Sequence, residues 1–221
     1  MRLAAPSWLR PGSWLENIET AASLPWLGAV EILLFEWDQK TRAVFTSELG
    51  GIISWTGRFK FSVHLPDPLG ESALDIAGLC SDFARAFVLH PPSTGGAEDW
   101  ADLVSRLREG FGDRFLLEYT GEDAFRLAES ALPDLPLCPD TGKLLLDGKE
   151  PAEWIGARRH RVQALHLHAA REGRDHFPLD SRDAWLVRLL PLLETFAFPI
   201  ELEVFSLEAV EASRAALEAL A

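Results

Sequence analysis

Short apolar runs recur along the chain at intervals of about 25 residues, and more polar segments separate them. The runs are typical of buried β-strands, because they are brief, rich in aliphatic and aromatic residues, and bounded by polar or turn-forming residues. Eight such runs are Arg2–Ala5, Ala29–Phe35, Phe59–Leu65, Ala86–His90, Arg114–Tyr119, Leu135–Cys138, Arg161–His168 and Pro199–Phe205. The clearest helical segments between and after them are Glu98–Gly110, Gly121–Leu132, Ser181–Phe196 and Ser206–Ala221.

This alternation predicts an α/β fold with parallel strands. Strands that are separated by helices pair in parallel through right-handed crossovers. Eight strand–helix units predict a closed (β/α)8 TIM barrel. A length of 221 residues is short for this barrel, so we expect a compact form with some short helices. No low-complexity linker divides the chain, and we expect a single domain over residues 1–221.

The composition narrows the class of protein. A hydrophobic content of 48% is enough for a core and argues against disorder. No apolar run approaches the roughly 20 residues of a membrane span, and Pro6, Arg10 and Pro11 interrupt the N-terminal segment before the apolar region of a signal peptide. Cys80 and Cys138 are far apart and match no CxxC pattern, which favours free thiols in a reducing compartment. We therefore expect a cytoplasmic protein.

The chain is strongly acidic, with 34 Asp and Glu against 21 Lys and Arg and a formal net charge of −13. Duplex nucleic acids are bound largely through Lys and Arg that contact phosphates. The charge therefore argues against a duplex-binding protein.

The polar residues of the candidate strands fall on one face. In Phe59–Leu65 and Arg161–His168, period-2 alternation separates apolar side chains from His64, His166 and His168. Helices cover the outer face of a barrel strand, so the ionisable face is expected inside the barrel. Seven such residues lie at or near the C-terminal ends of six strands, where barrel active sites are built: His64, His90, Glu118, Asp140, His166, His168 and Glu203.

A lone histidine or glutamate at a strand end is commonly a solvated or salt-bridged residue of the rim. Several carboxylates and imidazoles that converge inside one barrel are different, because they would repel or stay unpaired unless a cation compensates them. This pattern favours divalent metal ions.

Other chemistries fit less well. The chain has no GxGxxG, GxxxxGK[ST] or GxSxG motif, and neither cysteine has an obvious activating base. The segment Ser93–Gly96 could offer backbone amides to a phosphate, but the pattern favours an ordinary loop.

An ordered series of motifs resembles a known superfamily. The motifs are VEILLFE (residues 30–36), FSVHLP (61–66), FVLHPP (87–92), LLEYT (116–120), CPDTGK (138–143), ALHLH (164–168), GRDHFPL (173–179) and ELEVF (201–205). Together they resemble the xylose-isomerase-like TIM barrels, the AP endonuclease family 2 superfamily that includes endonuclease IV and many sugar isomerases and epimerases. Within it, the motifs are most similar to those of the cobamide-remodelling phosphodiesterases.

The resemblance implies two metal sites that share a glutamate. The first would be formed by His64, His90 and Glu118, and the second by Glu118, Asp140, His166 and Glu203. Such mixed nitrogen and oxygen ligands suit Zn or Mn. His176 matches a ligand of a third metal in the endonuclease, and His168 would stand beside the site as an acid or an orienting group.

The chain departs from the family at Lys143, where the superfamily usually has a histidine in a D-x-x-H pattern. A protonated lysine is a poor metal ligand. We hypothesise that the Lys143 ammonium replaces the third cation and holds a phosphate oxygen; the alternative is that Lys143 points to solvent.

Three functions follow from this resemblance. The first is a metal-dependent hydrolase that cleaves a phosphodiester in a small or medium-sized substrate, in its narrower form the nucleotide loop of a cobamide. The second is a sugar or sugar-phosphate isomerase or epimerase that uses one metal and carboxylate proton shuttles. The third is a binding protein without catalysis. The expected partner is a small molecule, with a corrinoid as the narrower candidate, and neither duplex nucleic acid nor a membrane. Oligomeric state and metal identity stay open.

Overall fold

A parallel sheet forms the centre of the molecule. The computed structural model describes residues 1–92 and 96–220. Its sheet has seven strands in the order β6-β5-β4-β3-β2-β1-β9. The strands are β1 (Leu3–Pro6), β2 (Leu27–Leu33), β3 (Lys60–His64), β4 (Ala84–Leu89), β5 (Phe115–Glu118), β6 (Leu137–Cys138) and β9 (Ile200–Glu201). Each lies within or overlaps a run that the sequence predicts as a strand, and each sheet pairing is parallel as expected.

The eighth position is filled by an irregular segment. Residues 162–168 lie between β6 and β9 and are joined to them by isolated parallel bridges, Leu137 with Val162, Asp140 with His166, and His166 with Glu201. The prediction of a continuous strand over Arg161–His168 is therefore wrong in its detail. The Leu137 amide donates to the Arg161 carbonyl and the Thr141 amide to the His166 carbonyl. Pro139 between them has no amide hydrogen, which interrupts the ladder.

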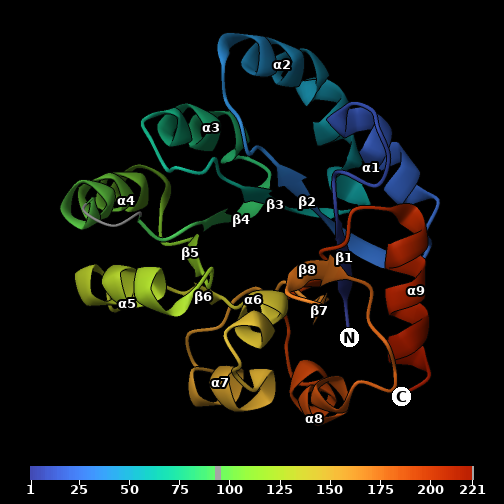
Figure 1. Cartoon of the computed structure of the whole chain (residues 1–221). Coiled ribbons are helices and arrows are strands. Elements are labelled where there is room, and N and C mark those ends of the chain that lie inside the picture. The colour runs from blue at the N-terminus through green and yellow to red at the C-terminus, as the bar shows by residue number, and fades with distance from the viewer. Residues whose placement is uncertain (93–95, 221) are drawn as a thin grey trace.

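The bridges nevertheless close the sheet, and the chain is a (β/α)8 barrel. Helices surround the strands (Figure 1): α1 (Trp14–Ala22), α2 (Gln39–Ser54), η1 (Trp55–Gly57), α3 (Ser72–Cys80), α4 (Ala97–Phe111), α5 (Glu122–Ala131), α6 (Thr141–Leu146), α7 (Pro151–Ala157), α8 (Ala184–Leu193) and α9 (Leu207–Glu218). As expected for a compact barrel, some are short; α6 has 6 residues and α7 has 7. No helix in the described part of the chain is long and apolar enough to cross a membrane.

Apolar side chains divide between two cores. Phe61, Val63 and Leu165 belong to the large core between strands and helices. Val88, Leu116 and Cys138 form a small cluster inside the barrel. The alternation of faces is thus as predicted, because each strand sends alternate residues outward to the helices and inward to the barrel.

A two-stranded hairpin that the sequence analysis did not anticipate follows the irregular segment. It consists of β7 (Ala169–Arg171) and β8 (Arg174–Phe177), which pair antiparallel. Its two turn residues have positive φ angles, 52° at Glu172 and 74° at Gly173. Two such residues are what a tight hairpin with right-twisted strands requires. The hairpin brings Asp175 and His176 back to His168, which precedes it in the chain.

Candidate metal centre

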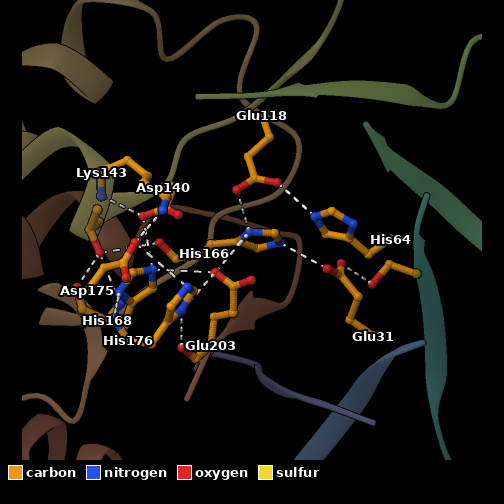
Figure 2. Close-up of polar contacts among 12 residues, drawn as sticks. Glu31, His64, Glu118, Asp140, Lys143, His166, His168, Asp175, His176 and Glu203 are labelled. Carbon is orange, nitrogen blue, oxygen red and sulfur yellow. Dashed lines mark hydrogen bonds and ion pairs between the residues drawn. The ribbon is translucent and has the colours of Figure 1, made fainter. Parts of the chain in front are cut away.

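Five of the six histidines of the chain gather with carboxylates at the C-terminal ends of the barrel strands. Figure 2 shows this group with His64, His166, His168 and His176 labelled. Every residue that the sequence predicts for the site is part of this group. The members are His64, His90, Glu118, Asp140, Lys143, His166, His168, His176 and Glu203. Residues from positions 64 to 203 therefore meet, because parallel strands end at the same rim of a barrel.

Glu118, the last residue of β5, stands between two groups of ligands. Its Oε2 lies 2.9 Å from Nε2 of His64 and 3.2 Å from Nε2 of His90. Its Oε1 lies on the side of His166, 3.6 Å from Nδ1. The two oxygens of one carboxylate thus face two different clusters.

Three histidines have one ring nitrogen fixed by an acceptor. Nδ1 of His64 bonds the Leu65 carbonyl at 2.9 Å, and Nδ1 of His176 bonds the Glu203 carbonyl at 3.1 Å. Nδ1 of His90 lies 2.9 Å from Oδ2 of Asp67. A carbonyl or carboxylate oxygen only accepts, so Nδ1 carries the proton and Nε2 of each neutral ring is left with a lone pair. This is the arrangement that orients metal-binding histidines.

His166 occupies the middle of the cluster and is fully buried. Its Nδ1 lies 3.2 Å from Oε2 of Glu203, and its Nε2 lies 3.0 Å from Oε1 of Glu31. The sequence analysis missed Glu31 and Asp67 as neighbours of the site. Glu31 is the polar residue in the middle of an apolar strand, in VEILLFE, and that exception to the pattern was the available signal.

The segment Asp140-Thr141-Gly142-Lys143 carries four distinct contacts. Asp140 caps α6 by accepting the amide of Lys143 at 2.9 Å. The Thr141 hydroxyl donates to the His168 carbonyl at 2.7 Å and accepts the His168 amide at 2.9 Å. Gly142 packs directly under the His168 ring, since a Cβ placed there would lie 2.1 Å from Cε1 of that ring. This short segment therefore positions both a candidate ligand and His168.

His168 is fully buried and does not reach the opening. The amide of His176 donates to its Nδ1 at 2.9 Å, which leaves the ring proton on Nε2. That Nε2 lies 2.9 Å from Oδ1 of Asp140 and 3.4 Å from Oε2 of Glu203. This geometry suits an orienting group better than an acid that touches substrate.

Lys143 does not point freely to solvent. Its ammonium forms an ion pair with Asp175 of the hairpin, and its side chain is 32% exposed. Asp140 and Glu118 also contribute to raising the pKa of Lys143 against the effect of burial. His176 lies beside the pair, its Nε2 3.8 Å from Asp175, with a positive φ of 58° that is rare outside glycine. The hairpin thus places a cation, a carboxylate and an imidazole together.

The electrostatics of the cluster call for additional positive charge. Burial opposes ionisation of Glu118, but His166, His64 and His90 outweigh it and lower the pKa well below its ordinary value. Glu203 behaves in the same way, with its pKa lowered by His166 and His168 despite burial. His90 shows the reciprocal effect: Glu118 and Asp67 overcome burial and raise its pKa to about 9. The carboxylates are therefore anionic and are balanced by protons on imidazoles when no metal competes for those nitrogens.

The donor set fits divalent metal ions. Ligand atoms of His64, His90 and Glu118 lie within 4.8 Å of one another, as do those of Glu118, Asp140, His166 and Glu203. Several buried atoms lack a well-oriented hydrogen bond within the described residues: Oδ2 of Asp140, both ring nitrogens of His166, Nε2 of His168 and Oε2 of Glu203. Buried polar atoms without partners are costly, and a shared cation would satisfy them together. These buried groups could bind metal.

The opening of the barrel above the cluster, which we call the mouth, is apolar on one side. Trp8, Phe35 and Phe205 follow the adjacent strands β1, β2 and β9 and are 49%, 43% and 36% exposed. The Phe35 ring lies 4.8 Å from that of His64, and the Phe205 ring 4.8 Å from that of His176. We call Trp8, Phe35 and Phe205 the aromatic rim.

The side of the mouth next to His90 contains a cavity of about 590 Å³, lined by acidic residues that include Asp67, Asp99 and Asp102. Gly96 also lines this cavity, and the other residues of the suggested phosphate loop, 93–95, lie outside the described part of the chain.

Comparison with known proteins finds similar folds among solved structures, but the sequence identities are low. Neither a protein-family model nor a curated protein sequence matches the chain. A D-tagatose 3-epimerase-like protein is similar in structure, with a TM-score of 0.76, 15% identity and coverage of 100% of this chain and 97% of the other. For 3-keto-D-glucoside 4-epimerase from E. coli the TM-score is 0.66, with 12% identity and coverage of 100% and 98%.

Endonuclease IV from Thermus thermophilus is also similar, with a TM-score of 0.63, 18% identity and coverage of 99% of this chain and 100% of the other. A further match is an AP endonuclease of family 2 from Brucella melitensis, with a TM-score of 0.66, 14% identity and coverage of 93% of each chain. The solved structures that share this fold therefore include sugar epimerases and isomerases and endonucleases of AP family 2, and also a probable 3-DHS dehydratase.

Proposed function

We propose that the protein is a metal-dependent hydrolase that cleaves a phosphodiester in a small or medium-sized substrate. The observation that carries this proposal is the position of Glu118, whose two oxygens face two separate groups of candidate ligands. Pairs of metal ions recur at sites for displacement at phosphorus, and Glu118 would supply a ligand to both groups.

His64, His90 and Glu118 would hold one divalent ion, and Glu118, Asp140, His166 and Glu203 the other. Zn and Mn both suit this donor set. When bound, such a pair supplies a polarised phosphoryl oxygen and a water that ionises near neutral pH.

The chain's own groups at the opening complement a phosphate. Lys143 and His176 have side chains that are 32% and 27% exposed, and they are candidates to contact a non-bridging oxygen. His168 lies deeper and would hold Asp140 and Glu203 in place through its Nε2 proton. In this proposal Lys143 supplies the positive charge that a third metal would otherwise provide.

The narrower proposal is hydrolysis of the nucleotide loop of a cobamide, as part of corrinoid remodelling. It is supported by the similarity of the motifs to those of cobamide-remodelling phosphodiesterases and by the aromatic rim. Flat rings stack on exposed aromatic side chains with about 1–3 kcal/mol per ring. A substrate that combines a phosphodiester with large planar groups therefore suits this mouth.

A sugar isomerase or epimerase is the second candidate. The four ligand atoms of Glu118, Asp140, His166 and Glu203 are close enough to hold a single metal without the two histidines of the other group. Two of these carboxylates would then move protons next to a carbonyl. The presence of epimerases among the similar structures supports this candidate.

Metal content and substrate turnover distinguish the candidates. Protein purified without chelator is analysed for metals and is then incubated with a complete corrinoid while loss of the nucleotide loop is followed. We expect two metal ions per chain and release of the nucleotide loop. In Glu118→Gln we expect both the bound metal and the release of the loop to be lost. One ion per chain supports the isomerase, and no ion supports a binding role. No turnover with Zn or Mn and several lower ligands would refute the cobamide assignment.

The role of Lys143 is tested by restoring a histidine. If the ammonium replaces a cation, Lys143→His gains up to one further metal per chain and changes the activity. Lys149→His is the matched control, because Lys149 pairs with Glu122 away from the cluster. No gain in bound metal together with unchanged activity in Lys143→His would contradict the replacement.

A further inference from the structure

The inside of the barrel is filled on one side and hollow on the other. Val88, Leu116 and Cys138 pack beneath the rim on the side of β4, β5 and β6. On the side of β1, β2 and β3 the inward residues at the lower level are small, and a cavity of about 490 Å³ remains there, lined by Ala4, Ala29, Ser62 and others. Barrels of this type are normally filled by layers of side chains. This open space, which we call the floor cavity, is therefore unusual and could hold a small molecule.

Two glutamates form the inner end of the floor cavity. Glu31 and Glu201 both line it and are 2% and 4% exposed. Oε1 of Glu201 has no hydrogen-bond partner among the described residues, and Oε1 of Glu31 has no well-oriented one. The other oxygen of Glu31 accepts a bond from the Ser62 hydroxyl at 2.8 Å. A buried carboxyl oxygen without a partner is costly. Oε1 of Glu201 is such an oxygen, whereas Oε1 of Glu31 lies 3.0 Å from Nε2 of His166.

The outer end of the floor cavity carries the opposite charge. Arg2, Lys60 and Arg85 line it at the N-terminal ends of β1, β3 and β4 and are exposed. None of the three forms an ion pair with any residue that the structure describes. A metal ion that approaches from this end meets three positive charges, and a simple anion that enters meets the carboxylate of Glu31.

Only a ligand with both charges complements both ends. Lys60 lies opposite Ala29 and Ser62 opposite Glu31, so the glutamate level is two residues deeper than the lysine level. Two residues of strand correspond to roughly 6–7 Å. Between the two levels the wall includes Ala4, Ala164 and Phe198, which suits a short aliphatic spacer. A volume of about 490 Å³ lies in the range of small-molecule sites.

We propose that the floor cavity binds a small amphoteric molecule, with a protonated amine at Glu201 and Glu31 and a carboxylate or phosphate at Arg2, Lys60 and Arg85. An ω-amino acid with a chain of about four to six carbons has the required separation of charges. This site lies at the end of the barrel opposite the aromatic rim and does not depend on the proposed hydrolase activity. It shares only Glu31 and His166 with the candidate metal centre.

Calorimetric titration with 5-aminopentanoate tests the proposal, with pentylamine and pentanoate as analogues that each lack one charge. The whole protein, as purified with its metals, is expected to bind the amphoteric probe at least tenfold more tightly than either analogue. Glu201→Gln is expected to abolish this preference. Glu208→Gln is the control, because Glu208 is an exposed residue in the first turn of α9, away from the floor cavity and the candidate metal centre; it is expected to retain the preference.

Several outcomes would overturn the proposal. They are no binding of 5-aminopentanoate at millimolar concentration, equal binding of pentylamine, and binding that survives Glu201→Gln. Binding of Mn²⁺ that is lost in Glu201→Gln but kept in Glu208→Gln would indicate a metal site instead and would also count against it. If Glu201→Gln does not fold, Lys60→Ala and Arg85→Ala replace it, since both side chains are exposed; together they are expected to weaken binding at least fivefold, and unchanged binding would refute the proposal.

Discussion

Substitution of Gly142 by alanine examines the packing that positions His168. Gly142 belongs to α6, where alanine would ordinarily stabilise a helix by up to about 1 kcal/mol. Here the added Cβ would lie 2.1 Å from Cε1 and 2.4 Å from Nδ1 of His168. The ring would have to move by more than about 1 Å to restore an ordinary contact.

That movement has a cost that the neighbours of His168 define. The ring centroid lies 4.3 Å from that of His176, so the displaced ring meets another side chain. Overpacking of this kind costs about 1–3 kcal/mol. Loss of the bond from the His176 amide leaves a buried group unpaired, which costs about 1–3 kcal/mol more. After the gain in helix propensity, we expect a net loss of about 3 kcal/mol, or roughly 6–12 °C in Tm.

Urea denaturation of Gly142→Ala and Gly78→Ala measures this difference. Gly78 lies inside α3, and a Cβ placed there would have nothing within 4 Å, so its substitution is expected to stabilise by up to about 1 kcal/mol. In the background of His168→Ala, the penalty at position 142 is expected to fall within about 0.5 kcal/mol of zero. A Gly142→Ala protein as stable as Gly78→Ala, or a penalty that persists without the His168 ring, would refute the packing argument.

Three further outcomes follow from the structure. In metal-free protein the pKa of His90 is raised to about 9, so its charged ring stabilises the fold fully below about pH 6.5, and this contribution is lost as pH rises through 9. The unfolding free energies of wild type and His90→Ala, measured by urea titration across pH 6–10, should therefore converge at high pH. A difference that stays constant with pH would contradict this. Burial raises the pKa of both Cys80 and Cys138 to about 12, so the native protein should not react with a thiol reagent at pH 8, whereas unfolded protein should show two thiols. Thr141→Val removes two buried bonds to His168 and should cost about 1–3 kcal/mol of unfolding free energy; a loss below about 0.5 kcal/mol would mean that the hydroxyl does not hold that segment.

The inward direction of the site residues could be predicted from local pattern. His64 alternates with Val63 and Leu65 on a short strand, so one face is apolar and the other ionisable. In a barrel the apolar face packs on helices, and the polar face has only the interior left. The same argument applies to Glu203 between Leu202 and Val204.

Other features had only a weak local signal. Glu31 lies in an apolar strand, and its role depends on His166, which is 135 positions later but 3.0 Å away. The hairpin that pairs Lys143 with Asp175 depends on two positive φ angles at Glu172 and Gly173, and only the glycine hints at them in the sequence.

The α/β alternation, the barrel and the set of residues at its rim could all be predicted from the chain, because periodicity and strand polarity are local properties. Three features required the folded structure: which oxygen of Glu118 faces which histidine, the need for position 142 to lack a side chain, and the hollow half of the barrel floor. Each of these features depends on distances or volumes between segments that come together only when the sheet closes. A pattern along the chain therefore cannot predict them.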